Sequence, residues 1–215
     1  MGEQTILFLH GFASSARGTK AHYFRERLAN RPHVTYHAVD FNPTPTDFAH
    51  VTTTGLINRL RQYVLDHDLQ TVAIIGSSFG GLVATHYAHR YGGVERMLLL
   101  APLLRWRSGD MTAEQLHTWE QTGTIPVMHY AFDRELPIRF DLEADGVRYA
   151  EPAPPAADTL IIHGSQDESV PVADSQQYAA DFAERVQLLK VDAGHDLNEH
   201  LALIWSHVQS FLLEP

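Results

Sequence analysis

The chain has 215 residues, of which 44% are hydrophobic and 20% are charged, and it contains no Cys. This length and composition are typical of one globular domain and argue against disordered, collagen-like and coiled-coil proteins. The 16 basic and 26 acidic residues give a net charge of −10, which disfavours a nucleic-acid partner. The absence of Cys excludes a disulfide scaffold, a thiolate metal site and a cysteine nucleophile.

The charge is unevenly distributed along the chain. Residues 1–109 carry 11 basic and 7 acidic side chains, whereas residues 110–215 carry 5 and 19. The longest apolar stretch, Met97–Leu104, is much shorter than the roughly 20 residues that span a bilayer, and the N-terminus leads directly into a strand-like run without a secretory signal. We therefore expect a cytoplasmic protein that does not bind membranes. The sequence does not indicate its oligomeric state.

Short apolar runs alternate with amphipathic segments, which predicts βαβ units and a mostly parallel sheet of about six strands. The predicted strands are Thr5–His10, Val34–Val39, Thr71–Ile75, Arg96–Ala101, Thr159–His163 and Val186–Val191. The predicted helices are Thr19–Asn30, Val51–His67, Phe79–Tyr91, Ala173–Glu184 and Leu197–Leu213. Consecutive apolar positions in several strands indicate that helices cover both faces of the sheet.

Residues 103–155 interrupt the alternation and are rich in aromatic side chains. Within this segment Thr112 and Gln115 form a capping-box pattern, which predicts a helix to about Gln121. Long insertions between sheet elements are usually functional. We expect one domain over residues 1–215 in which residues 103–155 form a cap; the alternative is that the aromatic rings only build a satellite core.

A G-x-S-x-G pattern, Gly76-Ser77-Ser78-Phe79-Gly80, lies between a predicted strand and a predicted helix. This is the context of a nucleophile elbow, where a sharp turn exposes the serine and flanking glycines avoid steric collisions. The glycine spacing selects Ser78, because Ser77 would need a glycine where Ile75 stands. The alternative is an ordinary glycine-rich turn.

Two further loops carry the partners that a nucleophilic serine requires. Asp167 follows the predicted strand Thr159–His163, and His195 follows the last predicted strand. A histidine can take the serine proton and return it to the leaving group, while an acid orients the imidazole. We predict the catalytic residues Ser78, Asp167 and His195. Nearby acids that compete for the role of Asp167 are Glu168, Asp192 and Asp196.

Acyl transfer also needs donors for the developing oxyanion. The backbone N–H of Phe79, directly after the nucleophile, is the first candidate, and the N–H of Phe12 in the loop after the first strand is the second. We also consider His10, Arg17, Trp106 and Trp119 as substrate-binding residues. Arg17 and Lys20 could hold an anionic group of the substrate, but the simpler alternative, that both belong to a solvated helix start, is favoured by the sequence. The 14 histidines show no metal-site spacing, so we expect no metal and no cofactor.

Together these motifs resemble the α/β-hydrolase superfamily over nearly the whole chain. Leu7–Phe12 is similar to the oxyanion strand and turn of that family, Ile75–Gly81 to its elbow, His163–Pro171 to its acid loop and Gly194-His195 to its histidine loop. The segment His10–Ala21 more particularly resembles small bacterial esterases and thioesterase-like members. The resemblance implies an α/β-hydrolase fold, without the antiparallel hairpin that opens larger members.

The residue types narrow the chemistry that this fold supports. A serine at position 78 disfavours dehalogenases and epoxide hydrolases, which need Asp there, and the absence of Cys disfavours dienelactone-type hydrolases. We predict a serine hydrolase that cleaves a small or medium carboxylic ester or thioester through an acyl-enzyme. The alternatives are a non-catalytic binding protein with this fold and a hydrolase of small amides or peptides.

Overall fold

A computed structural model describes residues 3–109 and 111–213. Residues 1–2, 110 and 214–215, which the expected domain includes, lie outside the described residues. The main sheet has six strands in the order β2-β1-β3-β4-β7-β8, and every pairing in it is parallel. The strands are β1 (Gln4–Leu9), β2 (Val34–Val39), β3 (Val72–Ser77), β4 (Val94–Leu100), β7 (Asp158–Gly164) and β8 (Val186–Val191).

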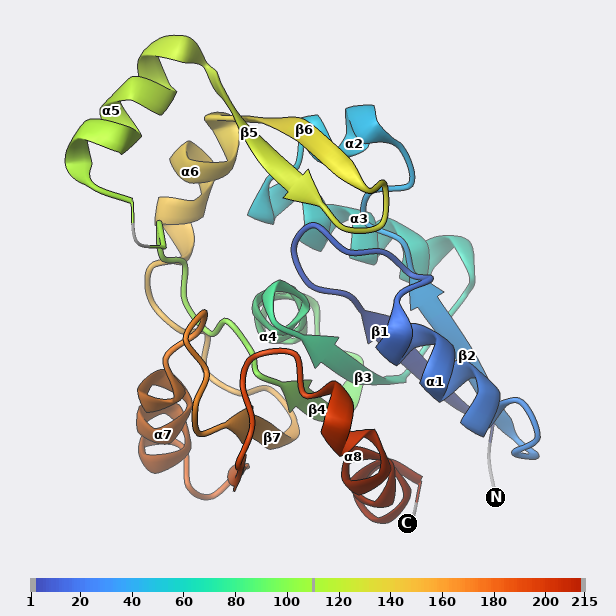
Figure 1. The fold of residues 1–215 in the computed structure, drawn as a ribbon. Coiled ribbons are helices and arrows are strands. Elements are labelled where there is room, and N and C mark those ends of the chain that lie inside the picture. Colours follow the sequence, from blue (N-terminus) through green and yellow to red (C-terminus); the bar gives the residue numbers. More distant parts are fainter. Residues whose placement is uncertain (1–2, 110, 214–215) are drawn as a thin grey trace.

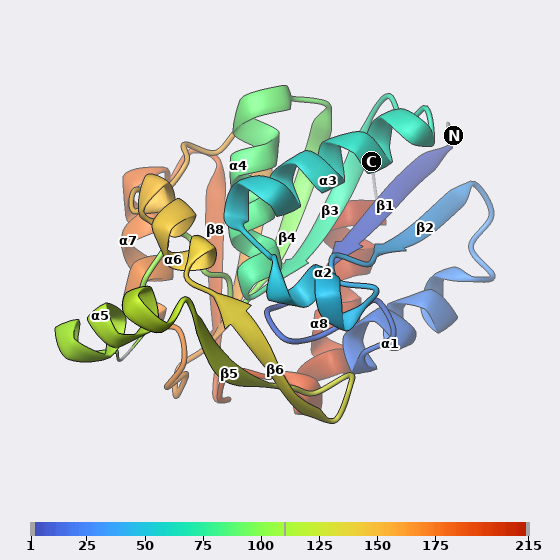
Figure 2. The ribbon, with the colours of Figure 1, turned by 90° about the horizontal axis from the view of Figure 1, so that it is seen from above.

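Helices cover both faces of this sheet, as Figures 1 and 2 show. One face packs against α3 (Thr53–Asp66), α4 (Phe79–Tyr91) and α7 (Val172–Asp181), and the other against α1 (Thr19–Leu28), α8 (Leu201–His207) and the π-helical segment η3 (Val208–Leu213) that follows it. The strands are buried on both sides, with Ile74 and Ile75 of β3 pointing to opposite cores and both fully covered. The α/β-hydrolase fold predicted from the sequence is confirmed.

The segment between β4 and β7 contains α5 (Ala113–Thr122), an antiparallel hairpin of β5 (Thr124–His129) and β6 (Arg134–Arg139), α6 (Asp141–Gly146) and the short turn η1 (Val147–Tyr149). Figure 2 shows it running along the edge where the parallel strands end. The predicted capping box is present at the start of α5, where Thr112 and Gln115 exchange hydrogen bonds of 2.7 and 3.2 Å.

This segment is attached to the rest of the domain through α6 and through the tip of the β5–β6 hairpin. Asp145 accepts hydrogen bonds from the backbone N–H (2.7 Å) and hydroxyl (2.6 Å) of Thr54 in α3. At the hairpin tip, the Tyr130 N–H donates to the carbonyl of Ala13 (3.1 Å) in the β1–α1 loop. The hairpin is therefore held against the loop that was predicted to carry an oxyanion donor.

The structure differs from the predicted elements in several places, and α6 and η1 are among the elements that the sequence did not predict. The hairpin β5–β6 and the short helix α2 (Pro45–Ala49) were not predicted, and the predicted last helix is divided into η2 (Asn198–His200), α8 and η3. Leu197, where the helix was predicted to begin, has a φ of 55° in the left-handed region that helices exclude, so the helical part starts at Asn198. Within the described ranges, none of the helices combines the length and the apolar character needed to cross a bilayer.

Candidate active site

Ser78 occupies a sharp turn between β3 and α4. Its φ of 54° and ψ of −119° are unusual for a residue with a side chain, and such strain is typical of functional turns. A Cβ at Gly76 would lie 2.9 Å from the Gly80 carbonyl oxygen, and one at Gly80 would overlap the carbonyl of Leu9. Glycines are therefore required at both positions for the turn to form against β1.

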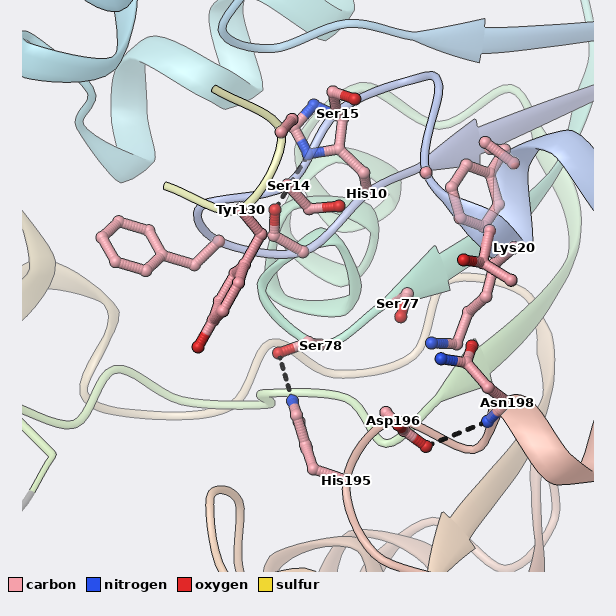
Figure 3. A pocket seen from close by; sticks show the side chains of 17 residues that line it. His10, Ser14, Ser15, Lys20, Ser77, Ser78, Tyr130, His195, Asp196 and Asn198 are labelled. Carbon is pink, nitrogen blue, oxygen red and sulfur yellow. Dashed lines mark hydrogen bonds between the residues drawn. The ribbon is translucent and has the colours of Figure 1, made fainter. Parts of the chain in front are cut away.

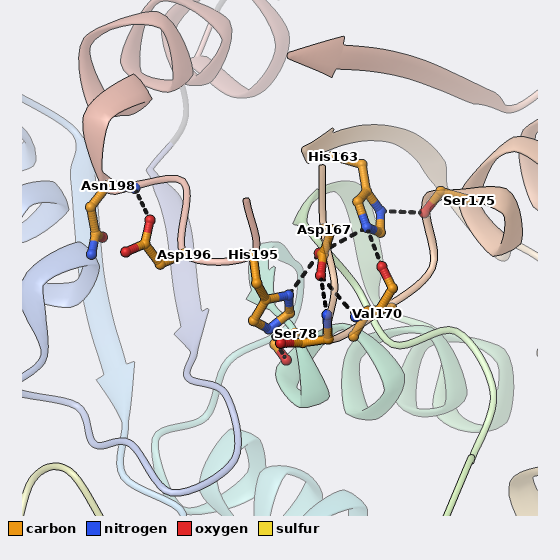
Figure 4. Close-up of polar contacts among 9 residues, drawn as sticks. Ser78, His163, Asp167, Val170, Ser175, His195, Asp196 and Asn198 are labelled. Carbon is orange, nitrogen blue, oxygen red and sulfur yellow. Dashed lines mark hydrogen bonds and ion pairs between the residues drawn. The ribbon is translucent and has the colours of Figure 1, made fainter. Parts of the chain in front are cut away.

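His195 and Asp167 lie beside Ser78 in one hydrogen-bonded series, as Figure 4 shows. The Nε2 atom of His195 is 3.0 Å from Ser78 Oγ, and its Nδ1 atom is 2.7 Å from Asp167 Oδ2. The three residues follow β3, β7 and β8, so the carboxyl ends of parallel strands bring them together. Because His195 lies between the other two side chains, it can accept the serine proton while Asp167 holds the opposite nitrogen.

The carboxylate of Asp167 is fully buried and well supplied with donors. Its Oδ1 accepts from the N–H groups of Ser169 (2.9 Å) and Val170 (2.8 Å), and its Oδ2 accepts from His195 and from His163 Nε2 (3.1 Å). Burial of a charge is costly unless donors surround it, and here four donors do so.

The competing acids predicted from the sequence are placed elsewhere. Glu168 is exposed, Asp192 accepts from the Gln166 side chain (2.6 Å), and Asp196 accepts from the Asn198 N–H (3.1 Å). Among the described residues, Asp167 is the acid whose carboxylate contacts His195. Its position makes it the candidate for orienting the imidazole.

His163 supports Asp167 from behind, a contact that sequence reasoning did not predict. Its Nε2 lies 3.1 Å from both Asp167 Oδ2 and the Val170 carbonyl, which are acceptors, so Nε2 carries the proton. Its Nδ1 then accepts from the Ser175 hydroxyl (2.8 Å) in α7. Burial lowers the pKa of His163, which favours this neutral form. The signal in the sequence was its position at the end of a buried strand, four residues before Asp167.

The two predicted oxyanion donors flank Ser78. The Phe79 N–H begins α4, and Phe12 follows Gly11, where a Cβ would lie 3.2 Å from Ser78 Cβ. Within residues 3–109 and 111–213, neither N–H has a protein acceptor. Neither N–H is engaged by another protein acceptor there, as the predicted role of an oxyanion donor requires.

Both ring nitrogens of His10 form hydrogen bonds within the protein, and one of these bonds orients the peptide between Gly11 and Phe12. Its Nε2 accepts from the Phe41 N–H (3.0 Å), which leaves Nδ1 to donate to the Gly11 carbonyl (2.8 Å). Because the carbonyl and N–H of a trans peptide point in opposite directions, this bond fixes the orientation of the Phe12 N–H. His10 was predicted to bind substrate; it lines a cavity, but both of its ring nitrogens are used within the protein.

Two cavities meet at Ser78 and His195. One, of about 360 Å³, is mainly apolar and lies under residues 103–155; its lining includes the predicted substrate-binding residues Trp106 and Trp119. The other, of about 580 Å³, is lined by the β1–α1 loop, the first turn of α1 and the loop after β8, as Figure 3 shows. Arg17 is exposed and lines neither cavity.

No cluster of three or more potential metal ligands occurs in the part of the chain that the structure describes. A family model for an uncharacterised protein family, UPF0227, matches residues 5–212. The chain belongs to UPF0227. This membership identifies relatives without supplying an activity.

Solved structures show that the UPF0227 chain shares its fold with α/β hydrolases. A putative hydrolase from Agrobacterium vitis S4 has a TM-score of 0.81 and 20% identity, over 97% of this chain and 87% of that one. Alpha/beta hydrolase domain-containing protein 10 from mouse has a TM-score of 0.76 and 19% identity, over 97% and 89% of the two chains. Est1E from Butyrivibrio proteoclasticus, with ferulic acid bound, has a TM-score of 0.75 and 17% identity, over 99% and 89%.

The turn at Ser78 gives a first prediction for this UPF0227 protein. Gly80→Ala should lower the free energy of unfolding by about 1–3 kcal/mol, because the added Cβ overlaps the β1 backbone. Gly194→Ala is the control, since a Cβ there meets nothing within 4 Å, and its effect should stay near 0.5 kcal/mol. Urea unfolding measures both variants; equal losses would contradict the close-packing argument.

The neutral state of His163 gives a second prediction. Because folding lowers its pKa, the unfolded chain binds more protons than the folded one as pH falls below about 6.5. Stability should therefore decrease on acidification. His163→Gln, which removes this titration, should reduce the pH-dependence of the unfolding free energy between neutral pH and pH about 5. An unchanged pH-dependence in the variant would show that His163 does not titrate as described.

Proposed function

We propose that this protein is a serine hydrolase that cleaves a carboxylic ester or thioester through an acyl-enzyme. The observation that carries the proposal is the hydrogen-bonded series Ser78, His195 and Asp167, with donor–acceptor distances of 3.0 and 2.7 Å. A serine hydroxyl is a weak nucleophile unless a base removes its proton. The names of solved structures with this fold, which include esterases, give further support.

In the proposed reaction, Ser78 Oγ attacks the carbonyl carbon while its proton passes to His195 Nε2. The carbonyl becomes an oxyanion that accepts from the Phe79 and Phe12 N–H groups, and Asp167 stabilises the imidazolium. His195 then donates the proton to the departing alcohol or thiol, which leaves an ester on Ser78. A water that His195 deprotonates attacks this ester and releases the acid, and the proton returns to Ser78.

Residues 103–155 act in this proposal as a cap that determines acyl size. The cavity of about 360 Å³ beside Ser78 is formed by apolar side chains of this segment together with Phe12, Phe79 and Val170. Ile125 and Val127 of β5 line the cavity, as does Ile138 of β6, which pairs with Ile125. Leu136, which pairs with Val127, belongs to the hydrophobic core. An apolar pocket of this size favours a small or medium acyl group.

The nucleophile is tested by labelling with a fluorophosphonate and by hydrolysis of p-nitrophenyl butyrate. Wild-type protein should be labelled at Ser78, and Ser78→Ala should lose both label and activity. Asp167→Asn should reduce kcat by ~10⁴-fold, as expected when the histidine tautomer is lost, while the neighbouring exposed Glu168→Gln should not. Absence of labelling and hydrolysis in the wild type would instead support a binding protein.

The acyl cavity is tested with a chain-length series of esters, thioesters and matching amides. Ile125→Trp should shift the preferred acyl chain to a shorter one, because the larger ring fills the cavity. Met128→Trp, on the exposed side of the same strand, is the matched control and should leave the preference unchanged. A preference for amides would favour the amidase alternative, and a chain-length profile insensitive to Ile125→Trp would place the acyl group elsewhere.

A further inference from the structure

The second cavity at Ser78 differs in chemistry from the apolar one. It has a volume of about 580 Å³, and its lining combines apolar groups such as Phe8 and Phe12 with the polar side chains of Ser14, Ser15, Thr19, Lys20 and Asn198, beside Ser78 and His195. In Figure 3 the side chains of Lys20 and Asn198 extend from the side opposite to Tyr130. A substrate whose acyl group fills the apolar cavity would extend its leaving group into this polar space.

Lys20 is the basic side chain among the residues that line this cavity. It is half-buried, and among the described residues it has neither a hydrogen-bond acceptor nor a carboxylate at ion-pair distance. Burial lowers its pKa, and the nearby Asp196 carboxylate opposes that effect without forming an ion pair. A half-buried ammonium group without a direct counter-ion is stabilised by a ligand that brings a negative charge.

The surroundings of Lys20 favour one negative charge on the ligand rather than several. Asp196 is exposed at the edge of the cavity, and the chain as a whole carries a charge of −10. The first turn of α1 contains no acidic residue and its N-cap provides no side-chain acceptor, so the helix start adds modestly to the local positive potential. A carboxylate is the group that fits these charges.

We propose that the polar cavity binds the leaving group of the substrate, and that Lys20 recognises a carboxylate on that leaving group. This inference rests on the proposed hydrolase function, because it assigns the acyl group to the other cavity. Asn198 and the serine hydroxyls of the β1–α1 loop supply hydrogen bonds to the polar remainder of the leaving group. Lys20 thus acts as a specificity residue and takes no part in the proton transfers at Ser78.

The kinetic test compares two butyrate esters of matched phenols, one with a carboxymethyl and one with a carbamoylmethyl substituent. The methylene keeps the phenol reactivity similar, so the ratio of kcat/KM values reports recognition of charge. We expect the wild type to favour the carboxylate ester by about tenfold. Lys20→Met should bring the ratio close to one, Lys20→Arg should retain part of it, and high salt should reduce it.

The chain provides a matched control because it contains two lysines, Lys20 and Lys190. Lys190 is exposed on β8 and lines neither cavity, so Lys190→Met should keep the wild-type ratio. Asp196→Asn should increase the ratio by removing the competing carboxylate. A wild-type ratio near one, or a ratio that Lys20→Met leaves unchanged, would overturn the role of Lys20.

A binding test separates this inference from the hydrolase proposal. In the Ser78→Ala variant, 3-hydroxyphenylacetate should protect Lys20 from modification by trinitrobenzenesulfonate, while its amide should not and Lys190 should stay reactive. Peptide mass spectrometry measures the two lysines separately. Equal modification of Lys20 with and without the carboxylate would overturn the site. If the wild type hydrolyses neither ester, the hydrolase proposal and the leaving-group role fail together, and protection then reports a carboxylate site alone.

Discussion

The turn at Ser78 is the constraint on which the geometry of the site depends. The Ser78 N–H donates to the Leu100 carbonyl at the end of β4 (2.9 Å), and its own carbonyl accepts from Gly81 in α4 (2.8 Å) and Leu103 (3.0 Å). One residue thus connects the sheet, the helix and the first residue of the cap segment. Its positive φ persists because these bonds and the glycine contact with β1 leave little alternative.

The buried carboxylate of Asp167 is a second fixed point, and it depends on the first only through His195. An ionised group in an apolar interior is destabilising by several kcal/mol unless it is paired and hydrogen-bonded. The donors from Ser169, Val170, His163 and His195 meet this need, and the bond from Ser175 extends the network into α7. The acid loop is therefore held by the domain core, whereas the His195 imidazole is partly exposed.

Much of the fold could be predicted from the sequence because the strands of the main sheet are continuous apolar runs with helices between them. The chain order of Ser78, Asp167 and His195 identified residues that the structure brings within hydrogen-bond distance. The hairpin β5–β6 escaped prediction because each strand contains a proline. Pro126 and Pro137 lie opposite each other, in a pair that exchanges no hydrogen bonds, so neither strand loses a ladder bond there.

Roles that depend on side-chain partners were less accessible to sequence reasoning. The sequence did not indicate the hydrogen-bond partners of His163 and His10. Their tautomers follow from contacts with the Val170 carbonyl and the Phe41 N–H, which spacing along the chain does not predict. The cavities were equally hidden, since each is lined by residues from at least three parts of the chain. Sequence spacing identifies groups that follow strands, whereas packing decides what those groups face.

The two cavities also separate the determinants of the proposed specificity. The apolar cavity is formed largely by the cap segment, whereas the polar one is formed mainly by the β1–α1 loop, the first turn of α1 and the loop after β8, with Tyr130 and Ala131 of the hairpin tip. The basic N-terminal half supplies Lys20 and the acidic C-terminal half supplies Asp196, so the field at the polar cavity reflects both halves of the chain. Because the two cavities share only Phe12, Ser78 and His195 among their lining residues, substitutions at unshared positions of one cavity should affect acyl recognition and those of the other should affect leaving-group recognition nearly additively.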